Sequence, residues 1–160
     1  MEGIIVKVFA IIMFELTVVS NTPLTGLEDL NRVALQFLQQ IGYISKGYDP
    51  KTDANDVQDS VPYRLFTECF IRNMNRPWIV EEMAVHLGTT KPTIYRHLNK
   101  LKGLDILEEV EVERGDSHKK GYRIRYGDLG KAWSFTEANV EMAMASYRKS
   151  VEHLQRLSEE

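Results

Sequence analysis

Residues 78–101 decide the fold, and they read WIVEEMAVHLGTTKPTIYRHLNKL. The first half repeats apolar side chains at helical spacing and stops at Gly88, a residue type that commonly ends helices. The second half begins at Thr89 or Thr90, either of which can cap a helix that has Pro92 in its first turn. The stretch therefore predicts two short helices joined by a tight turn.

The second of these helices has one buried and one cationic face. Ile94, Leu98 and Leu101 recur at spacings of four and three residues and define the buried stripe. From Thr89 to Gly103 there are four basic residues and no acidic one, in a chain of formal net charge −3. Because solvated helices usually mix both signs of charge, this face favours contact with an anion such as DNA over simple exposure to water.

One more helix is predicted on the amino-terminal side of this stretch. Pro62 can occupy its first turn, and the apolar pattern over residues 62–75 would bury Cys69 among aromatic and aliphatic side chains. Pro77 is then expected to open the helix that ends at Gly88. The sequence thus predicts three helices in succession.

After the third helix the apolar pattern changes to the alternation that is typical of strands. A symmetric hairpin pairs Val112 with Ile124 on its core side and leaves residues 114–121 as a long basic tip. Glu113 then lies opposite Arg123 on the outer side, and opposite charges favour that register. Three helices followed by a hairpin is the order of a winged helix-turn-helix, so the expected fold class is mainly α with a small β-hairpin.

The helix-turn-helix resembles that of the ArsR-like winged-helix regulators. The likeness lies in the Glu-Glu-apolar-Ala pattern that begins at Glu81 and in the Pro-Thr-apolar-Tyr-Arg-His-Leu pattern that begins at Pro92, and it extends to Tyr126. It implies a dimeric, prokaryotic-type transcription factor that places its third helix in the major groove of DNA. Metal-sensing members carry paired cysteines in the preceding helix, and this chain has none there, so metal sensing by that route is not expected.

Candidate DNA contacts follow from the outward face of the third helix, from the hairpin tip and from the resemblance. The planar guanidinium of Arg96 suits the two acceptor atoms of guanine in the major groove. The resemblance also implies contacts from Lys91, Tyr95 and His97. The full set of candidate DNA-binding residues is Thr90, Lys91, Thr93, Tyr95, Arg96, His97, Asn99, Lys100, Arg114, Lys119 and Lys120.

Residues 1–44 are predicted to form an amino-terminal extension. Its apolar stretch at residues 3–19 favours one or two buried strands, and charges interrupt it too often for a membrane-spanning helix. A capping box at residues 25–28 predicts the start of a helix, which Gly42 would end. Residues 45–61 are predicted to be a solvated linker, because the apolar pattern gives way there to Gly, Pro, Asp, Asn and Lys. The alternative is a calcium loop, but Lys51 occupies an early ligand position, and the central glycine and terminal glutamate of such a loop are missing.

Residues 62–130 are the expected DNA-binding domain, and residues 131–160 are expected to be a carboxy-terminal helix that starts at a capping box over residues 134–137. Apolar residues at alternating spacings of four and three then predict a heptad seam. The seam consists of Val140, Met144, Tyr147, Val151 and Leu154. It predicts a homodimer, and the alternative is an amphipathic helix packed on its own domain.

Composition and motifs narrow the classes of function. Residues 62–131 carry 13 basic and 10 acidic side chains, so the positive charge is concentrated there although the chain is acidic overall. The four histidines show no metal-ligand spacing, and no nucleotide-binding loop or hydrolase motif occurs. We therefore expect no metal site, no cofactor and no enzymatic activity. The single cysteine fits a reducing, cytoplasmic location.

These patterns favour a sequence-specific transcriptional regulator that binds double-stranded DNA. The alternative is a winged-helix module that docks a protein or an RNA without sequence-specific DNA binding. A third hypothesis, in which the amino-terminal region binds a small-molecule effector, is compatible with the first.

Overall fold

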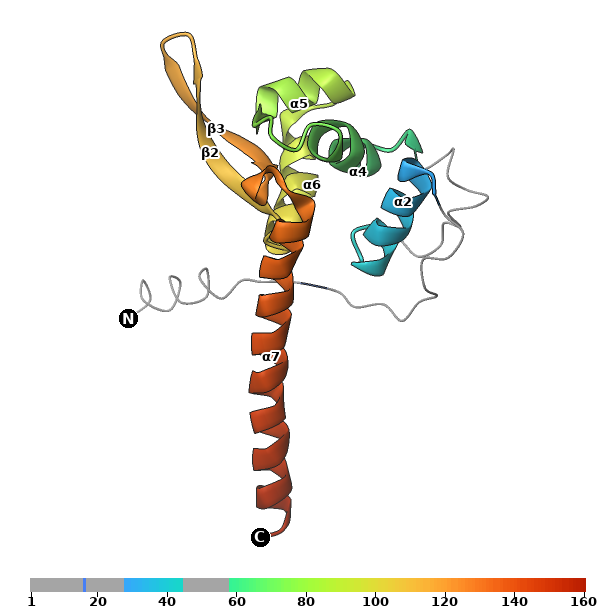
Figure 1. Ribbon diagram of the computed structural model, residues 1–160. Helices are drawn as coiled ribbons and strands as arrows, with labels where there is room; N and C mark the ends of the chain where they lie inside the picture. Colours follow the sequence, from blue (N-terminus) through green and yellow to red (C-terminus); the bar gives the residue numbers. More distant parts are fainter. Residues whose placement is uncertain (1–15, 17–27, 45–57) are drawn as a thin grey trace.

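The computed structural model describes residue 16, residues 28–44 and residues 58–160 (Figure 1). Within these ranges the protein is mainly helical with one small three-stranded antiparallel sheet, which confirms the expected class of secondary structure. The strands expected at residues 3–19 and most of the linker expected at residues 45–61 lie outside the described ranges.

The first described helix, α2, spans Leu30–Gln40. Its N-cap is Asp29, whose carboxylate accepts a hydrogen bond from the backbone N–H of Arg32 at 3.3 Å. This helix therefore begins later than the start predicted from the capping box at residues 25–28, and residues 25–27 of that box lie outside the described ranges. Gly42 follows the end of the helix with a φ of 75°, as predicted.

A short α-helix, α4 (Val61–Arg64), continues directly into a π-helix, η1 (Leu65–Ile71). The sequence predicted one α-helix over residues 62–75, so the wider turn and the earlier end are corrections. In a π-helix each N–H bonds to the carbonyl five residues earlier, as Arg72 N–H does to the carbonyl oxygen of Thr67 at 3.0 Å. The buried face of η1 carries Leu65, Phe66, Cys69 and Phe70.

A two-residue strand, β1 (Trp78–Ile79), precedes the helix α5 (Val80–Leu87). Pro77 therefore does not open α5 as predicted, because the next two residues pair with another strand before the helix begins. Gly88 ends α5 in the left-handed conformation with a φ of 65°, which confirms the predicted stop.

The helix α6 (Lys91–Gly103) follows after a short turn. Its N-cap is Thr90, whose hydroxyl oxygen accepts a hydrogen bond from the backbone N–H of Thr93 at 3.4 Å. The predicted stripe is completely buried, and it consists of Ile94, Leu98 and Leu101. This packing determines which face of α6 points outward.

Two long strands, β2 (Leu107–Arg114) and β3 (Ser117–Ile124), form the hairpin, and the order of strands in the sheet is β1-β3-β2. Only Gly115 and Asp116 connect the two strands, and Gly115 has the positive φ of 63° that tight hairpin turns require. The long basic tip predicted over residues 114–121 does not form. Lys119 and Lys120 instead belong to β3.

The register of the hairpin also differs from the prediction. Leu107 lies opposite Ile124, where Val112 was expected, and Arg123 lies opposite Glu108. The short turn determines this register, since every added turn residue would shift the pairing. Leu107 and Ile124 are buried as a result, with 5% and 0% of their surface exposed.

The last helix, α7 (Leu129–Ser158), begins earlier than predicted. Asp128 is its N-cap and accepts a backbone hydrogen bond from the first turn at 3.1 Å. The capping box predicted at residues 134–137 is therefore wrong. Thr136, which belonged to that box, is buried and donates a hydrogen bond to the carbonyl oxygen of Leu104 at 2.8 Å.

One hydrophobic core joins α2, η1, α5, α6, the base of the hairpin and the start of α7. An aromatic cluster links the two ends of the described chain, because Phe37 stacks on Phe66 at 5.9 Å and meets Trp133 edge-on at 5.4 Å. The core thus fixes α6 and the hairpin relative to each other.

The carboxy-terminal half of α7 stands away from the rest of the molecule (Figure 1). Every side chain from Met144 to Ser158 is exposed, so this part of the seam does not pack on its own domain. None of the helices in the described ranges combines the length and hydropathy needed to cross a membrane.

Candidate nucleic-acid interface

The outward face of α6 presents several of the candidate side chains to solvent. The exposed ones are Tyr95, Arg96, Asn99 and Lys100, and Thr93 and His97 beside them are partly buried. The opposite side of the helix is completely buried in the core, so this face has one fixed orientation. Such a helix can present its side chains to a duplex without first becoming ordered.

Arg96 and Lys100 are not neutralised by a carboxylate. Among the residues that the structure describes, no aspartate or glutamate lies within ion-pair distance of either side chain. Burial, followed by the positive charges of Arg96 and Lys100, lowers the pKa of His97 below its ordinary value. The lowered pKa favours the neutral form of the His97 imidazole in the free protein.

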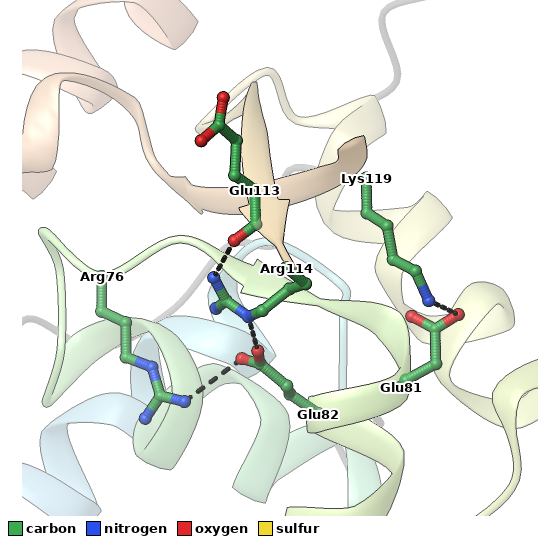
Figure 2. A network of polar contacts seen from close by, with 6 residues as sticks. All are labelled: Arg76, Glu81, Glu82, Glu113, Arg114 and Lys119. Carbon is green, nitrogen blue, oxygen red and sulfur yellow. Dashed lines mark hydrogen bonds and ion pairs between the residues drawn. The ribbon is translucent and has the colours of Figure 1, made fainter. Parts of the chain in front are cut away.

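The first residue of α6 has a different environment. Lys91 Nζ lies 3.4 Å from Glu81 Oε1, and Lys119 Nζ from β3 lies 3.4 Å from the same oxygen. Figure 2 shows the contact between Glu81 and Lys119. A hydrogen bond from its own backbone N–H, helped by the two lysines and opposed by burial, lowers the pKa of the Glu81 carboxyl. One ionised carboxylate thus connects α5, α6 and β3.

Glu82, the next residue of α5, binds two arginines. Arg114 Nε at the end of β2 lies 2.6 Å from its carboxylate, and Arg76 Nη2 lies 3.2 Å from it (Figure 2). Burial raises the pKa of Glu82, but the hydrogen bonds and charges of Arg114 and Arg76 outweigh burial, and the pKa is lowered. Glu82 therefore anchors the tip of the hairpin to α5.

The third candidate cation of the hairpin, Lys120, is also paired. Lys120 Nζ lies 3.7 Å from Glu109 Oε2, and Lys102 Nζ from α6 lies 2.9 Å from Glu109 Oε1. Near the tip, Glu111 and Glu113 are 75% and 78% exposed, so the hairpin presents both signs of charge. Each hairpin cation predicted to contact DNA thus has a carboxylate within 4 Å.

The fold brings α6 and the hairpin together at a shallow recess of about 300 Å³. Its lining includes the candidates Tyr95, Lys119 and Lys120, together with Glu81 and Tyr122. Arg114 lies apart from this group, on Glu82 at the other side of the α5 start. The predicted residues therefore form one main surface on α6 and β3, with Arg114 beside it.

Sequence reasoning missed the carboxylates that neutralise the hairpin. Glu81 and Glu82 stand together in the first turn of α5, and Glu109 is one of several glutamates in β2. A signal was present for Glu109 alone, because an acidic residue diagonal to a lysine on the same face of two paired strands is within reach of it. The wrong register and the expected long tip concealed that signal.

Cys69 is completely buried, and burial raises the pKa of its thiol to about 12. A thiol in this state is a poor nucleophile, so Cys69 acts as a packing residue of η1. Within the described ranges, no group of three or more histidine, cysteine, aspartate or glutamate side chains could hold a metal ion.

No protein-family model matches the chain, and no curated protein matches it at a significant level.

Proposed function

We propose that this protein is a sequence-specific transcriptional regulator that binds double-stranded DNA through a winged helix-turn-helix of the ArsR-like type. The observation that carries the proposal is the outward face of α6. Arg96 and Lys100 are exposed there without a carboxylate partner among the described residues, on a helix whose other side is buried. The major groove of DNA admits an α-helix, so a fixed cationic face suits insertion into it.

The order of elements supports the winged-helix assignment. The helices η1, α5 and α6 are followed by the hairpin of β2 and β3, and β1 adds a third short strand to the sheet. The turn between α5 and α6 is short and uses Gly88 and Thr90 as its stop and start signals. In this proposal α6 is the recognition helix and the hairpin is the wing.

Individual residues would have different roles in the complex. Arg96 lies in the middle of α6, where its planar fork would bind guanine, and Asn99 and Lys100 would contact neighbouring base edges or phosphates. The hydroxyl of Thr90 already accepts a hydrogen bond as the N-cap, so its role is to fix the start of α6. Lys91 would bind the phosphate backbone beside it.

The proposal includes a homodimer and a cytoplasmic location, without enzymatic activity. A single winged helix contacts too little of a duplex for high specificity, and a second copy would double the site. The seam on α7 is free to supply the contact, since Met144, Tyr147 and Leu154 are 60%, 62% and 65% exposed. Light scattering should give the mass of a dimer in the micromolar range, and a monomer would contradict this part of the proposal.

Selection of binding sites from random DNA tests the function directly. We expect recovery of a shared sequence, and fluorescence anisotropy should show that a selected duplex binds more tightly than a scrambled one. Affinity for both should fall steeply with added salt, because cations that bind phosphates release counter-ions. Binding that is insensitive to salt, or no shared sequence, would favour the alternative of a protein- or RNA-docking module.

A further inference from the structure

Two glutamates in the first turn of α5 each bind a cation of the hairpin (Figure 2). Glu81 also lies within ion-pair distance of Lys91 at the start of α6, whereas the second cation beside Glu82 is Arg76, which precedes β1. We infer that Glu81 is an internal counter-ion that keeps affinity for DNA of arbitrary sequence low, so that retention on DNA depends on the base contacts of α6. The inference rests on the proposed DNA-binding function and names a regulation of the same surface.

The geometry of Glu81 differs from that of a simple surface pair. A single oxygen, Oε1, lies 3.4 Å from Lys91 Nζ and 3.4 Å from Lys119 Nζ. Two ammonium groups that converge on one anionic oxygen create the arrangement that a phosphate oxygen would also occupy. In the free protein the carboxylate occupies this position, and its lowered pKa keeps it ionised at neutral pH.

Lysines held in this way contribute little to sequence-independent binding. Such binding arises from cations that neutralise phosphates and release the counter-ions condensed on DNA. A lysine that leaves Glu81 for a phosphate exchanges one anion for another, and the carboxylate then stays beside the DNA without its partner. Lys91 and Lys119 therefore add less to the affinity than two unpaired lysines would add.

Arg96 is subject to no such exchange, because no carboxylate among the described residues lies within ion-pair distance of it. Its contacts with base edges add to the affinity only on the correct sequence. With the phosphate contribution held low by Glu81, these base contacts decide whether the protein stays bound at physiological salt.

Glu82 has a different role. Its side chain is 24% exposed against 40% for Glu81, and its contacts with Arg114 and Arg76 are shorter, at 2.6 and 3.2 Å. The carboxylate of Glu82 is thus more enclosed and holds the hairpin on α5. In this inference only the cations bound to Glu81 leave their carboxylate for a DNA phosphate, and those bound to Glu82 stay in place.

The test removes the negative charge of Glu81 and keeps the shape of its side chain. Glu81→Gln should bind both a selected and a scrambled duplex about three- to tenfold more tightly than the wild type at low salt. The slope of the logarithm of affinity against the logarithm of salt concentration should become steeper by about 2, because Lys91 and Lys119 are released to bind phosphates. Fluorescence anisotropy of the full chain across a salt series gives both quantities.

Two controls make the test specific. Glu152→Gln makes the same charge change on the exposed half of α7, and it should leave the salt dependence unchanged. In a background of Lys91→Ala with Lys119→Ala, Glu81→Gln should no longer steepen the salt dependence. An equal steepening in that background would overturn the inference, since Glu81 would then act by simple repulsion of DNA.

The outcomes also separate the inference from the function on which it rests. If the wild type binds DNA and Glu81→Gln behaves like Glu152→Gln, the inference is overturned and the DNA-binding function stands. If neither the wild type nor any variant binds either duplex at low salt, the proposed function fails and the inference fails with it.

Discussion

The middle of the outward face of α6 and the hairpin both carry cations, but among the described residues those of the hairpin have carboxylate partners, whereas Arg96 and Lys100 do not. Arg96 and Lys100 have no carboxylate partner in the described ranges, whereas Lys119 and Lys120 lie 3.4 and 3.7 Å from a glutamate. The two regions therefore differ in available charge although each contains four lysine and arginine residues. The positions of the anions, and not the number of cations, determine which of the two surfaces has cationic side chains available for an external anion.

The difference has a local cause in each element. The helix segment from residue 89 to residue 103 contains no acidic residue, so no carboxylate of the helix itself can approach Arg96. In the hairpin, Lys120 of β3 is paired with Glu109 of the neighbouring strand β2. Lys119 and Arg114 are instead paired with Glu81 and Glu82 in the first turn of α5. The carboxylates that neutralise the hairpin therefore come both from β2 and from α5.

The largest expected effect is a loss of stability when a buried side chain of α6 is shortened. Leu98→Ala should lower the free energy of unfolding by about 2–5 kcal/mol, because Leu98 is completely buried and its loss leaves a cavity in the core. Val112→Ala in the hairpin should have a smaller effect, since Val112 is 7% exposed and lies outside the main core cluster. Urea denaturation measures both. Equal losses would show that the hairpin is as firmly supported as α6.

The second effect is a loss of DNA affinity that distinguishes contacts of α6 with base edges from contacts with phosphates. Arg96→Ala should weaken binding to a selected duplex by about 1–3 kcal/mol, and much less on a scrambled duplex, because its contacts are with base edges. Arg148→Ala on the exposed part of α7 is the matched control and should change neither affinity. An equal loss on both duplexes would contradict the base-reading role of Arg96 while leaving DNA binding intact.

A smaller effect is expected from the hairpin. Two unpaired lysines on phosphates would reduce the salt slope by about 2 when both are replaced by alanine. Because Lys119 and Lys120 are paired with glutamates, we expect Lys119→Ala with Lys120→Ala to reduce it by about 1 or less, with similar changes on both duplexes. A full reduction of about 2 would remove the contrast between the two regions, since the hairpin lysines would then be as available as those of α6.

The sequence predicted the helical elements well where their signals are local. The buried stripe of α6, its cap at Thr90 and the stop at Gly88 depend on periodicity and on single residues, and all three are confirmed. The outward face of α6 follows directly from them. Exposure of Arg96 and Lys100 was therefore predictable, although their role in DNA binding stays a prediction.

The failures occurred where nonlocal contacts decide the structure. Pairing with β3 turns Trp78 and Ile79 into a strand, although Pro77 before them suggested the start of a helix. Thr136 looked like part of a cap, but it bonds to the carbonyl oxygen of Leu104 in the core. The tight turn at Gly115 then moved Lys119 and Lys120 from a predicted loop into a strand. Opposite charges alone could not select the register, because several registers of this hairpin pair a glutamate with a cation.

The smallest predicted effect is a pH dependence of the affinity for DNA, and it depends on His97 of α6. Burial, Arg96 and Lys100 lower the pKa of His97 in the free protein. A phosphate placed beside α6 would raise that pKa in the complex, because an anion stabilises the charged imidazole. The complex then binds more protons than the free protein, so affinity for DNA should increase as the pH falls from about 7.5 to about 6.

The hairpin supplies the control for this effect. His118 of the hairpin lies 3.4 Å from Glu111 and 3.9 Å from Glu113, so its surroundings differ from those of His97, and His118→Asn is the matched control substitution. His97→Asn should abolish the increase, which we expect to be less than tenfold for one histidine with a modest shift. Anisotropy at constant ionic strength measures it. If His97→Asn retains the full pH dependence and His118→Asn loses it, the titrating surface is the hairpin, and the assignment of the DNA-facing side to α6 would have to be reversed.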